Sequence, residues 1–119
     1  MKIKQIIAEI VDLANSHDLA AVVEYKTKDS TQIDIAIKDD TTNLVAIEFE
    51  SSYKWITHRI LYNAIKAKRE GFSNVVFIYP FNQKTIHKSW VKRFITDELK
   101  MNMKIAHPEE CLHIIEGLI

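Results

Sequence analysis

The chain has 119 residues with 16 basic and 16 acidic side chains, so its formal net charge at pH 7 is zero, which argues against a protein that coats nucleic acid electrostatically. This length predicts one domain, residues 1–119, with a single hydrophobic core. No apolar run is long enough to span a bilayer and no signal-peptide pattern precedes the first helix, so we expect a cytoplasmic protein without a membrane partner; the lone Cys111 excludes an internal disulfide.

The first half of the sequence predicts one helix followed by three strands. Apolar residues from Ile3 to Ala14 recur at spacings of three and four, as in an amphipathic helix. Segments 20–27, 31–38 and 43–49 are rich in β-branched residues that alternate with polar ones, which indicates strands. Because the links between them are short and turn-like, the three strands should form an antiparallel meander.

The next pair of predicted elements is a helix and a buried strand. Ser51 or Ser52 is expected to cap a helix that runs to about Glu70, with Gly71 as its C-terminal stop. Segment 74–80 is a continuous apolar run, which is typical of a strand covered on both faces and parallel to its neighbour.

The C-terminal part predicts a helix, a short strand and a closing helix. The helix covers about 83–99 with Trp90 on its inner face, the strand 103–107, and the last helix Pro108 to Leu118. The complete order predicts an α/β fold with three layers, helices lying on both sides of a mixed central sheet.

Three carboxylates interrupt the second and third predicted strands. Asp34, Glu48 and Glu50 lie among isoleucines and valines. The hairpin register that keeps the apolar residues on one side of the sheet sets Asp34 opposite Glu48 on the other side. Extending the pattern to the first strand sets Glu24 opposite Asp34 and places Lys26 on the same face.

A cation would explain this acidic face. Carboxylates held this close do not all ionise cheaply unless a cation or a proton lies between them. Mg²⁺ prefers one or two carboxylates with carbonyl and water oxygens, so Asp34 and Glu48 predict a Mg²⁺ or Mn²⁺ site with Glu50 within reach. The alternative is an ordinary solvated strand face. Ala36 and Ala46 lie on the same face and favour cover by a helix over open water.

The strand order and the acidic pair resemble the PD-(D/E)XK superfamily of nucleases, which have the restriction-endonuclease-like fold. The resemblance covers residues 2–80, with Asp34 as the first motif acid and Glu48 as the second. It implies a nuclease that hydrolyses phosphodiester bonds in DNA, with Mg²⁺ or Mn²⁺ held by these two acids. It also implies that a first-helix glutamate can join the metal ligands, and Glu9 is the candidate.

One departure from the family pattern affects catalysis. Glu50 occupies the position of the motif lysine, where it would act as an extra ligand or proton acceptor. Lys26, Lys54 and Lys66 are possible replacements for that lysine. From the motif alone, Glu50→Lys should retain or raise cleavage. Without a replacement the chain would be a catalytically inactive module that binds nucleic acid or a protein partner.

Basic and aromatic residues follow the acidic strands. The candidate phosphate contacts are Lys54, His58, Arg59 and Lys66, with a further basic stretch over 84–93; the alternative is that they form solvated helix faces. The aromatic residues near the start of the second helix, Trp55 among them, could stack on bases, although Trp55 at helical spacing is more often a core residue.

The chain length is similar to that of the small dimeric Holliday junction resolvases, which makes branched DNA a possible substrate. A homodimer is also expected, because a nuclease of this size has one active site per chain and the closing segment "LHIIEGLI" is apolar. The same segment is also typical of a helix that packs into its own core.

Overall fold

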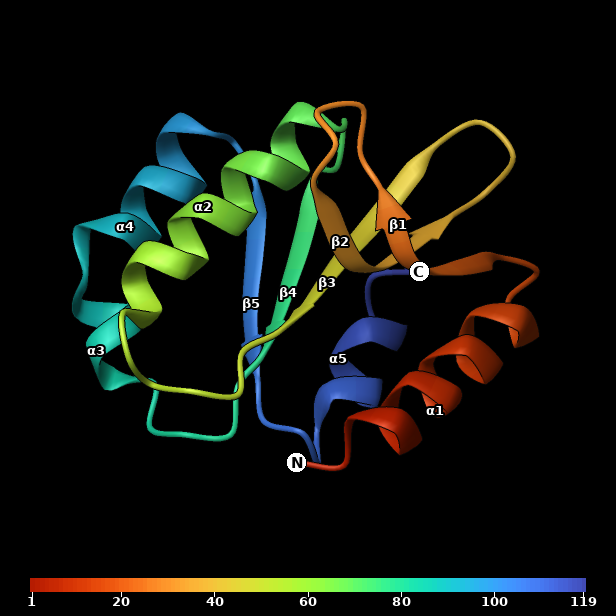
Figure 1. Cartoon of the computed structure of the whole chain (residues 1–119), viewed down its shortest axis with the longest axis horizontal. Helices are drawn as coiled ribbons and strands as arrows, with labels where there is room; N and C mark the ends of the chain where they lie inside the picture. The colour runs from red at the N-terminus through yellow and green to blue at the C-terminus, as the bar shows by residue number, and fades with distance from the viewer.

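The computed structural model describes all 119 residues as an α/β domain built on one five-stranded mixed sheet (Figure 1). The strands are β1 (Ala20–Lys26), β2 (Gln32–Lys38), β3 (Asn43–Phe49), β4 (Asn74–Ile78) and β5 (Asn102–Ala106), adjacent in that order. The first three form an antiparallel meander, and β3, β4 and β5 run parallel. Both the predicted meander and the parallel position of the fourth strand are confirmed.

Helices cover both faces of this sheet (Figure 1). They are α1 (Ile3–Ser16), α2 (Ile56–Arg69), α3 (Lys84–Lys88), α4 (Trp90–Arg93), a π-helical turn η1 (Phe94–Glu98) and α5 (Cys111–Glu116). Helices α1 and α5 pack on one face, while α2, α3, α4 and η1 pack on the other. None of these helices has the length and apolarity needed to cross a membrane.

The two sheet faces carry separate hydrophobic clusters. Ile10 of α1 and Ile115 of α5 pack with Ile47 on one side, and Ile60 of α2 packs with Phe77 on the other. Strand β4 contributes alternate residues to both clusters, because successive side chains of a strand point to opposite faces. This explains its continuous apolar sequence, since neither of its faces meets water.

The predicted register of β2 and β3 is confirmed from Ile35 to Ile37, but it shifts at Lys38, which pairs with Asn43, and the ladder is interrupted at Asp34. Ile35 pairs with Ile47 as expected, and the pairs continue away from the site. Beyond Ile35 the backbone ladder of β2 and β3 ends, and the backbone N–H of Phe49 donates to Oδ2 of Asp34 at 2.8 Å. Ile33 then joins the α2-side cluster and Ile35 the opposite one, although strict alternation would place these two residues on the same face.

The neighbouring strand is irregular at the same row. Glu24 has a left-handed backbone with φ of 54°, and the expected ladder pair with Asp34 is absent between the regular pairs of Val23 and Tyr25. Because a left-handed residue breaks the alternation of a strand, Glu24 does not simply extend the acidic face.

Helix α2 begins later than the sequence predicts. It starts at Ile56, after Trp55 in a left-handed conformation with φ of 56°. Neither predicted serine caps it; the hydroxyl of Ser52 instead accepts from the N–H of Lys54 at 3.1 Å, which forms a turn in the loop. The predicted stop is confirmed, because the helix ends at Arg69 and Gly71 follows with φ of 88°.

The helix predicted over 83–99 is broken into three pieces. Ser89 adopts an extended backbone, and its hydroxyl accepts from the N–H of Val91 at 3.1 Å, which starts a new helix. The break turns Trp90 outward, so the prediction that it faces the core is wrong. The last helix begins at Cys111, which is buried as expected, and Pro108 lies in the preceding turn.

Candidate functional site

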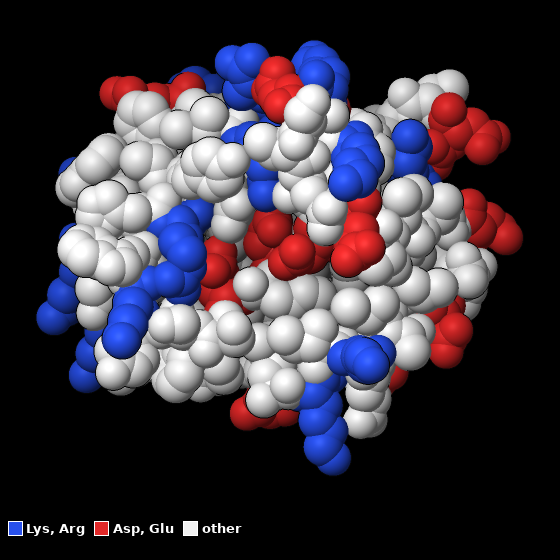
Figure 2. Space-filling model, in the orientation of Figure 1, with Lys and Arg blue, Asp and Glu red and all other residues white.

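The structure brings Asp34 and Glu48 close together, with Glu48 on the sheet face that α2 covers. Glu48 is buried on β3 and Asp34 is half-buried on β2. Figure 2 shows acidic side chains gathered in a hollow at the centre of the molecule, with basic side chains along its border. The acidic pair predicted from strand alternation is therefore present.

Lys66 of α2 is the cation beside this pair. Its Nζ lies 3.0 Å from Oε2 of Glu48 and donates to the backbone oxygen of Gln32 at 2.5 Å. Only 10% of its side chain is exposed, so the ammonium group is held in the site. Lys66 thus places a cation from α2 beside Glu48.

Glu48 has an unusual protonation equilibrium. Burial raises its pKa from 4.5 to about 7, and the negative charge of Asp34 also raises it. Lys66 opposes this shift by favouring the charged carboxylate. Near neutral pH a small change in local charge therefore decides whether Glu48 carries a proton.

One oxygen of Glu48 is not hydrogen-bonded. Oε2 is buried and lacks a partner in hydrogen-bond geometry, although Nζ of Lys66 is within 3.0 Å. We interpret the contact as an ion pair whose angle is poor for hydrogen bonding. A buried carboxylate oxygen in this state costs free energy, and a cation that coordinates it would remove that cost.

Asp34 and Glu48 fit a hard divalent ion only as a two-carboxylate set. No group of three carboxylate, imidazole or thiol side chains converges closely enough to hold a metal. Mg²⁺ accepts such sites because carbonyl and water oxygens complete its coordination. The donor types therefore suit Mg²⁺ or Mn²⁺ and do not suit Zn²⁺, which prefers sulfur and nitrogen.

Glu50 has a different environment from the other two acids. It is buried, its Oε1 accepts from Nε of Arg59 at 2.9 Å, and its Oε2 accepts from Nδ2 of Asn63 at 2.8 Å. Arg59 also donates to the backbone oxygens of Ser52 and Lys54. Both oxygens of Glu50 are thus engaged, and the contacts join β3, α2 and the loop between them.

The other predicted site residues are not brought to the acidic pair. Lys26 is exposed, 3.5 Å from the side chain of Gln32, and Lys54 is exposed in the loop before α2. Glu9 is exposed on α1, which packs on the opposite face of the sheet, and its charge acts on Cys111. The three-acid ligand set with Glu9 is therefore not assembled.

Asn63 is a site residue that the sequence analysis missed. It follows Arg59 by four residues on α2, so both side chains face the same way and reach the two oxygens of Glu50. That spacing was visible in the sequence, but nothing in it linked the helix face to Glu50.

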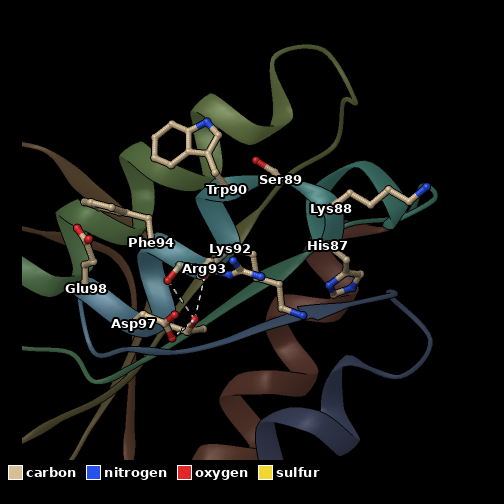
Figure 3. A pocket seen from close by; sticks show the side chains of 10 residues that line it. His87, Lys88, Ser89, Trp90, Lys92, Arg93, Phe94, Asp97 and Glu98 are labelled. Atoms are coloured by element: carbon tan, nitrogen blue, oxygen red, sulfur yellow. Dashed lines mark hydrogen bonds between the residues drawn. The ribbon is translucent and has the colours of Figure 1, made fainter.

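A second hollow of about 710 Å³ lies along α3, α4 and η1 (Figure 3). Its walls carry the basic side chains Lys88, Lys92 and Arg93 together with the acids Asp97 and Glu98. It contains neither residue of the acidic pair. Its mixed charge gives it no preference for an anion or a cation.

No family model, characterised protein or solved structure matches this chain at a significant level.

Proposed function

We propose that the protein is a metal-dependent nuclease with a PD-(D/E)XK-like site on a three-layer, restriction-endonuclease-like fold. The observation that carries the proposal is the contact of Lys66 with Glu48 beside Asp34. Two carboxylates from adjacent strands and one lysine are the charged groups that this chemistry requires. In this chain the lysine comes from a helix instead of the third strand.

Each residue of the site has a proposed role. Asp34 and Glu48 would hold Mg²⁺ or Mn²⁺, which when bound polarises a phosphate and lowers the pKa of a water molecule. Lys66 orients that water and offsets the negative charge that develops on the phosphate. Glu50 has no direct part in this proposal, because Arg59 and Asn63 occupy its oxygens.

DNA is the proposed substrate, and a branched form such as a Holliday junction is one candidate. The proposed phosphate contacts are His58 in the first turn of α2 and Lys54 in the loop before it, both exposed. Arg59 is a weaker candidate than the sequence suggested, because Glu50 already neutralises its charge. Lys66 belongs to the site itself.

A second candidate is a module that has lost catalysis and only binds. The zero net charge and the absence of a third converging ligand favour it. Mn²⁺ titration separates the two: a nuclease should bind the ion through Asp34, whereas a silent module should show no binding that depends on Asp34.

Cleavage assays test the proposal directly. We expect the wild-type protein to cut at least one of duplex, single-stranded and branched DNA with Mg²⁺ or Mn²⁺, and Asp34→Ala to abolish cutting. Lys66→Ala should lower the rate by about a hundredfold or more, as for the loss of a group that stabilises charge on the reacting phosphate. Lys26→Ala is the matched control and should retain activity, because Lys26 is exposed and does not contact either acid.

Thermal unfolding gives a readout that does not depend on the substrate. Metal that binds only the folded state raises the melting temperature. Wild type should therefore gain stability in millimolar Mn²⁺, and Asp34→Ala should gain none. Equal melting temperatures for wild type with and without Mn²⁺, together with uncut DNA, would refute the proposal.

A further inference from the structure

Large aromatic side chains are exposed to solvent in the loop before α2 and on the helix itself. Trp55 is 75% exposed, Tyr53 64% and Tyr62 57%. Apolar surface of this size clustered in one place marks a binding surface, because solitary exposed aromatics are common but groups of them are not. Of the two roles that the sequence left open for Trp55, a core residue or an exposed ring, the structure shows the exposed ring.

The exposed rings and the basic groups alternate along one side of α2. His58, Tyr62 and Lys66 follow each other at intervals of four residues on α2, so they lie on one helix face, and Trp55 immediately precedes the helix. The rings of Trp55 and His58 meet edge to face at 5.7 Å, and Nζ of Lys66 lies 5.6 Å from the ring of Tyr62. We call these four residues the aromatic row; it ends at the ion pair with Glu48.

The loop that carries Trp55 is held in place. Arg59 donates to the backbone oxygens of Ser52 and Lys54 while Glu50 holds its guanidinium group. Tyr53 packs edge to face on Phe81 at 5.6 Å, which ties the loop to the chain after β4. Trp55 keeps a left-handed backbone, a strained state that persists only where its surroundings impose it. A ring presented in this way loses little entropy on binding.

We propose that the aromatic row binds unpaired nucleotides of a DNA strand and leads that strand to Asp34 and Glu48. Exposed flat rings match the faces of unpaired bases, which a duplex keeps covered, and the imidazole of His58 between Trp55 and Tyr62 can donate to a phosphate. The proposal rests on the nuclease function and names its substrate as DNA with unpaired bases next to the cutting position.

Binding can be tested without cleavage. Affinity for a labelled oligothymidylate is measured by fluorescence anisotropy in EDTA, with a duplex of equal length as comparison. We expect the single strand to bind more tightly than the duplex. Trp55→Ala should weaken single-strand binding about tenfold, as for the loss of one base stack, and Trp55→Phe should retain most of it. Trp90→Ala is the matched control, because Trp90 is the only other tryptophan and is also exposed; its affinity should stay within about twofold of wild type.

Tryptophan fluorescence provides a second measurement. In Trp90→Phe the only tryptophan is Trp55, and oligothymidylate should quench its emission. Circular dichroism confirms that each variant is folded.

Three outcomes would overturn the proposed role of the aromatic row. They are unchanged affinity for oligothymidylate in both Trp55→Ala and Tyr62→Ala, equal affinity of the wild-type protein for duplex and single strand, or self-association of the protein that Trp55→Ala abolishes. If Trp55→Ala cleaves DNA at the wild-type rate and binds oligothymidylate with unchanged affinity, the proposed role of the aromatic row is refuted, whereas the nuclease proposal is not. Single-strand binding through Trp55 without any metal-dependent cleavage would support the row and refute the nuclease.

Discussion

At the scale of single residues, two glutamates at the end of one strand have opposite environments. Glu48 of β3 and Glu50, which follows the strand, are both buried on the side that α2 covers. Glu50 has a hydrogen-bond donor on each oxygen, whereas Glu48 has one oxygen without a donor and a pKa raised to about 7. A buried carboxylate with full hydrogen bonding stabilises the fold, and one without it remains available for chemistry.

The raised pKa of Glu48 predicts how stability depends on pH. The folded state holds the proton up to about pH 7, whereas the unfolded chain releases it near pH 4.5, so the folded state binds more protons in between. The stabilising contribution is complete below pH 4.5 and is lost as pH rises through 7. In metal-free buffer, the free energy of unfolding of wild type relative to Glu48→Gln should fall by on the order of 2–3 kcal/mol over this range.

Urea unfolding at several pH values measures this difference. Glu109→Gln is a suitable control, because Glu109 is exposed and its replacement should leave the pH profile parallel to wild type. A constant difference between wild type and Glu48→Gln from pH 4 to 8 would contradict the raised pKa.

At the scale of elements, the Glu50–Arg59 contact decides where α2 begins and where the preceding loop lies. Arg59 reaches back from the first turn of α2 to two loop carbonyls, and Asn63 holds the second oxygen of Glu50 from the next turn. These bonds explain why the helix starts at Ile56 with no side-chain cap. The loop is fixed by a buried ion pair instead of a capping serine.

The contacts of Glu50 reverse the prediction made from the motif alone. Glu50→Lys would place a second cation against Arg59 in a buried site, so we expect a loss of about 3 kcal/mol in the free energy of unfolding and lower cleavage. Chemical denaturation measures the loss. Asp12→Lys on the exposed face of α1 is the control and should stay within about 0.5 kcal/mol of wild type. A Glu50→Lys protein with wild-type stability and higher activity would restore the motif interpretation.

At the scale of the whole molecule, the sheet is shared by two hydrophobic clusters. One lies under α1 and α5 and the other under α2 to η1, and β3 and β4 contribute to both. Each cluster includes side chains of the sheet, so neither can stay packed once the sheet unfolds. The domain should therefore unfold as one cooperative unit.

Core substitutions on opposite faces test this cooperativity. Ile10→Ala and Ile60→Ala each remove a fully buried side chain and should each lower the free energy of unfolding by about 2–5 kcal/mol. Both variants should melt in a single transition seen equally by near- and far-ultraviolet circular dichroism. Ile65→Ala is the control, because Ile65 is 38% exposed and should cost much less. Two separated transitions in either core variant would show that the faces unfold independently.

The homodimer stays a prediction, but the apolar closing segment no longer supports it. Cys111 and Ile115 of α5 are buried against α1 and the sheet, so the apolar closing segment packs within the chain. Light scattering at micromolar concentration tests the prediction, and a monomer mass would refute it.

The sequence by itself determined the order of the strands, the pairing of the three antiparallel strands over most of their length and the closeness of Asp34 and Glu48. These features are local: alternation assigns each strand residue to a face, and short turns leave one register that keeps apolar residues together. The stop of α2 at Gly71 was equally local, because a left-handed position after a helix favours glycine.

Only the tertiary structure decided which groups meet those two acids. Lys66 reaches Glu48 because of the way α2 crosses the sheet, and Arg59 and Asn63 hold Glu50 for the same reason. The outward positions of Trp55 and Trp90 also depend on it. Helical periodicity states which residues share a face, but packing between distant elements determines which face is covered.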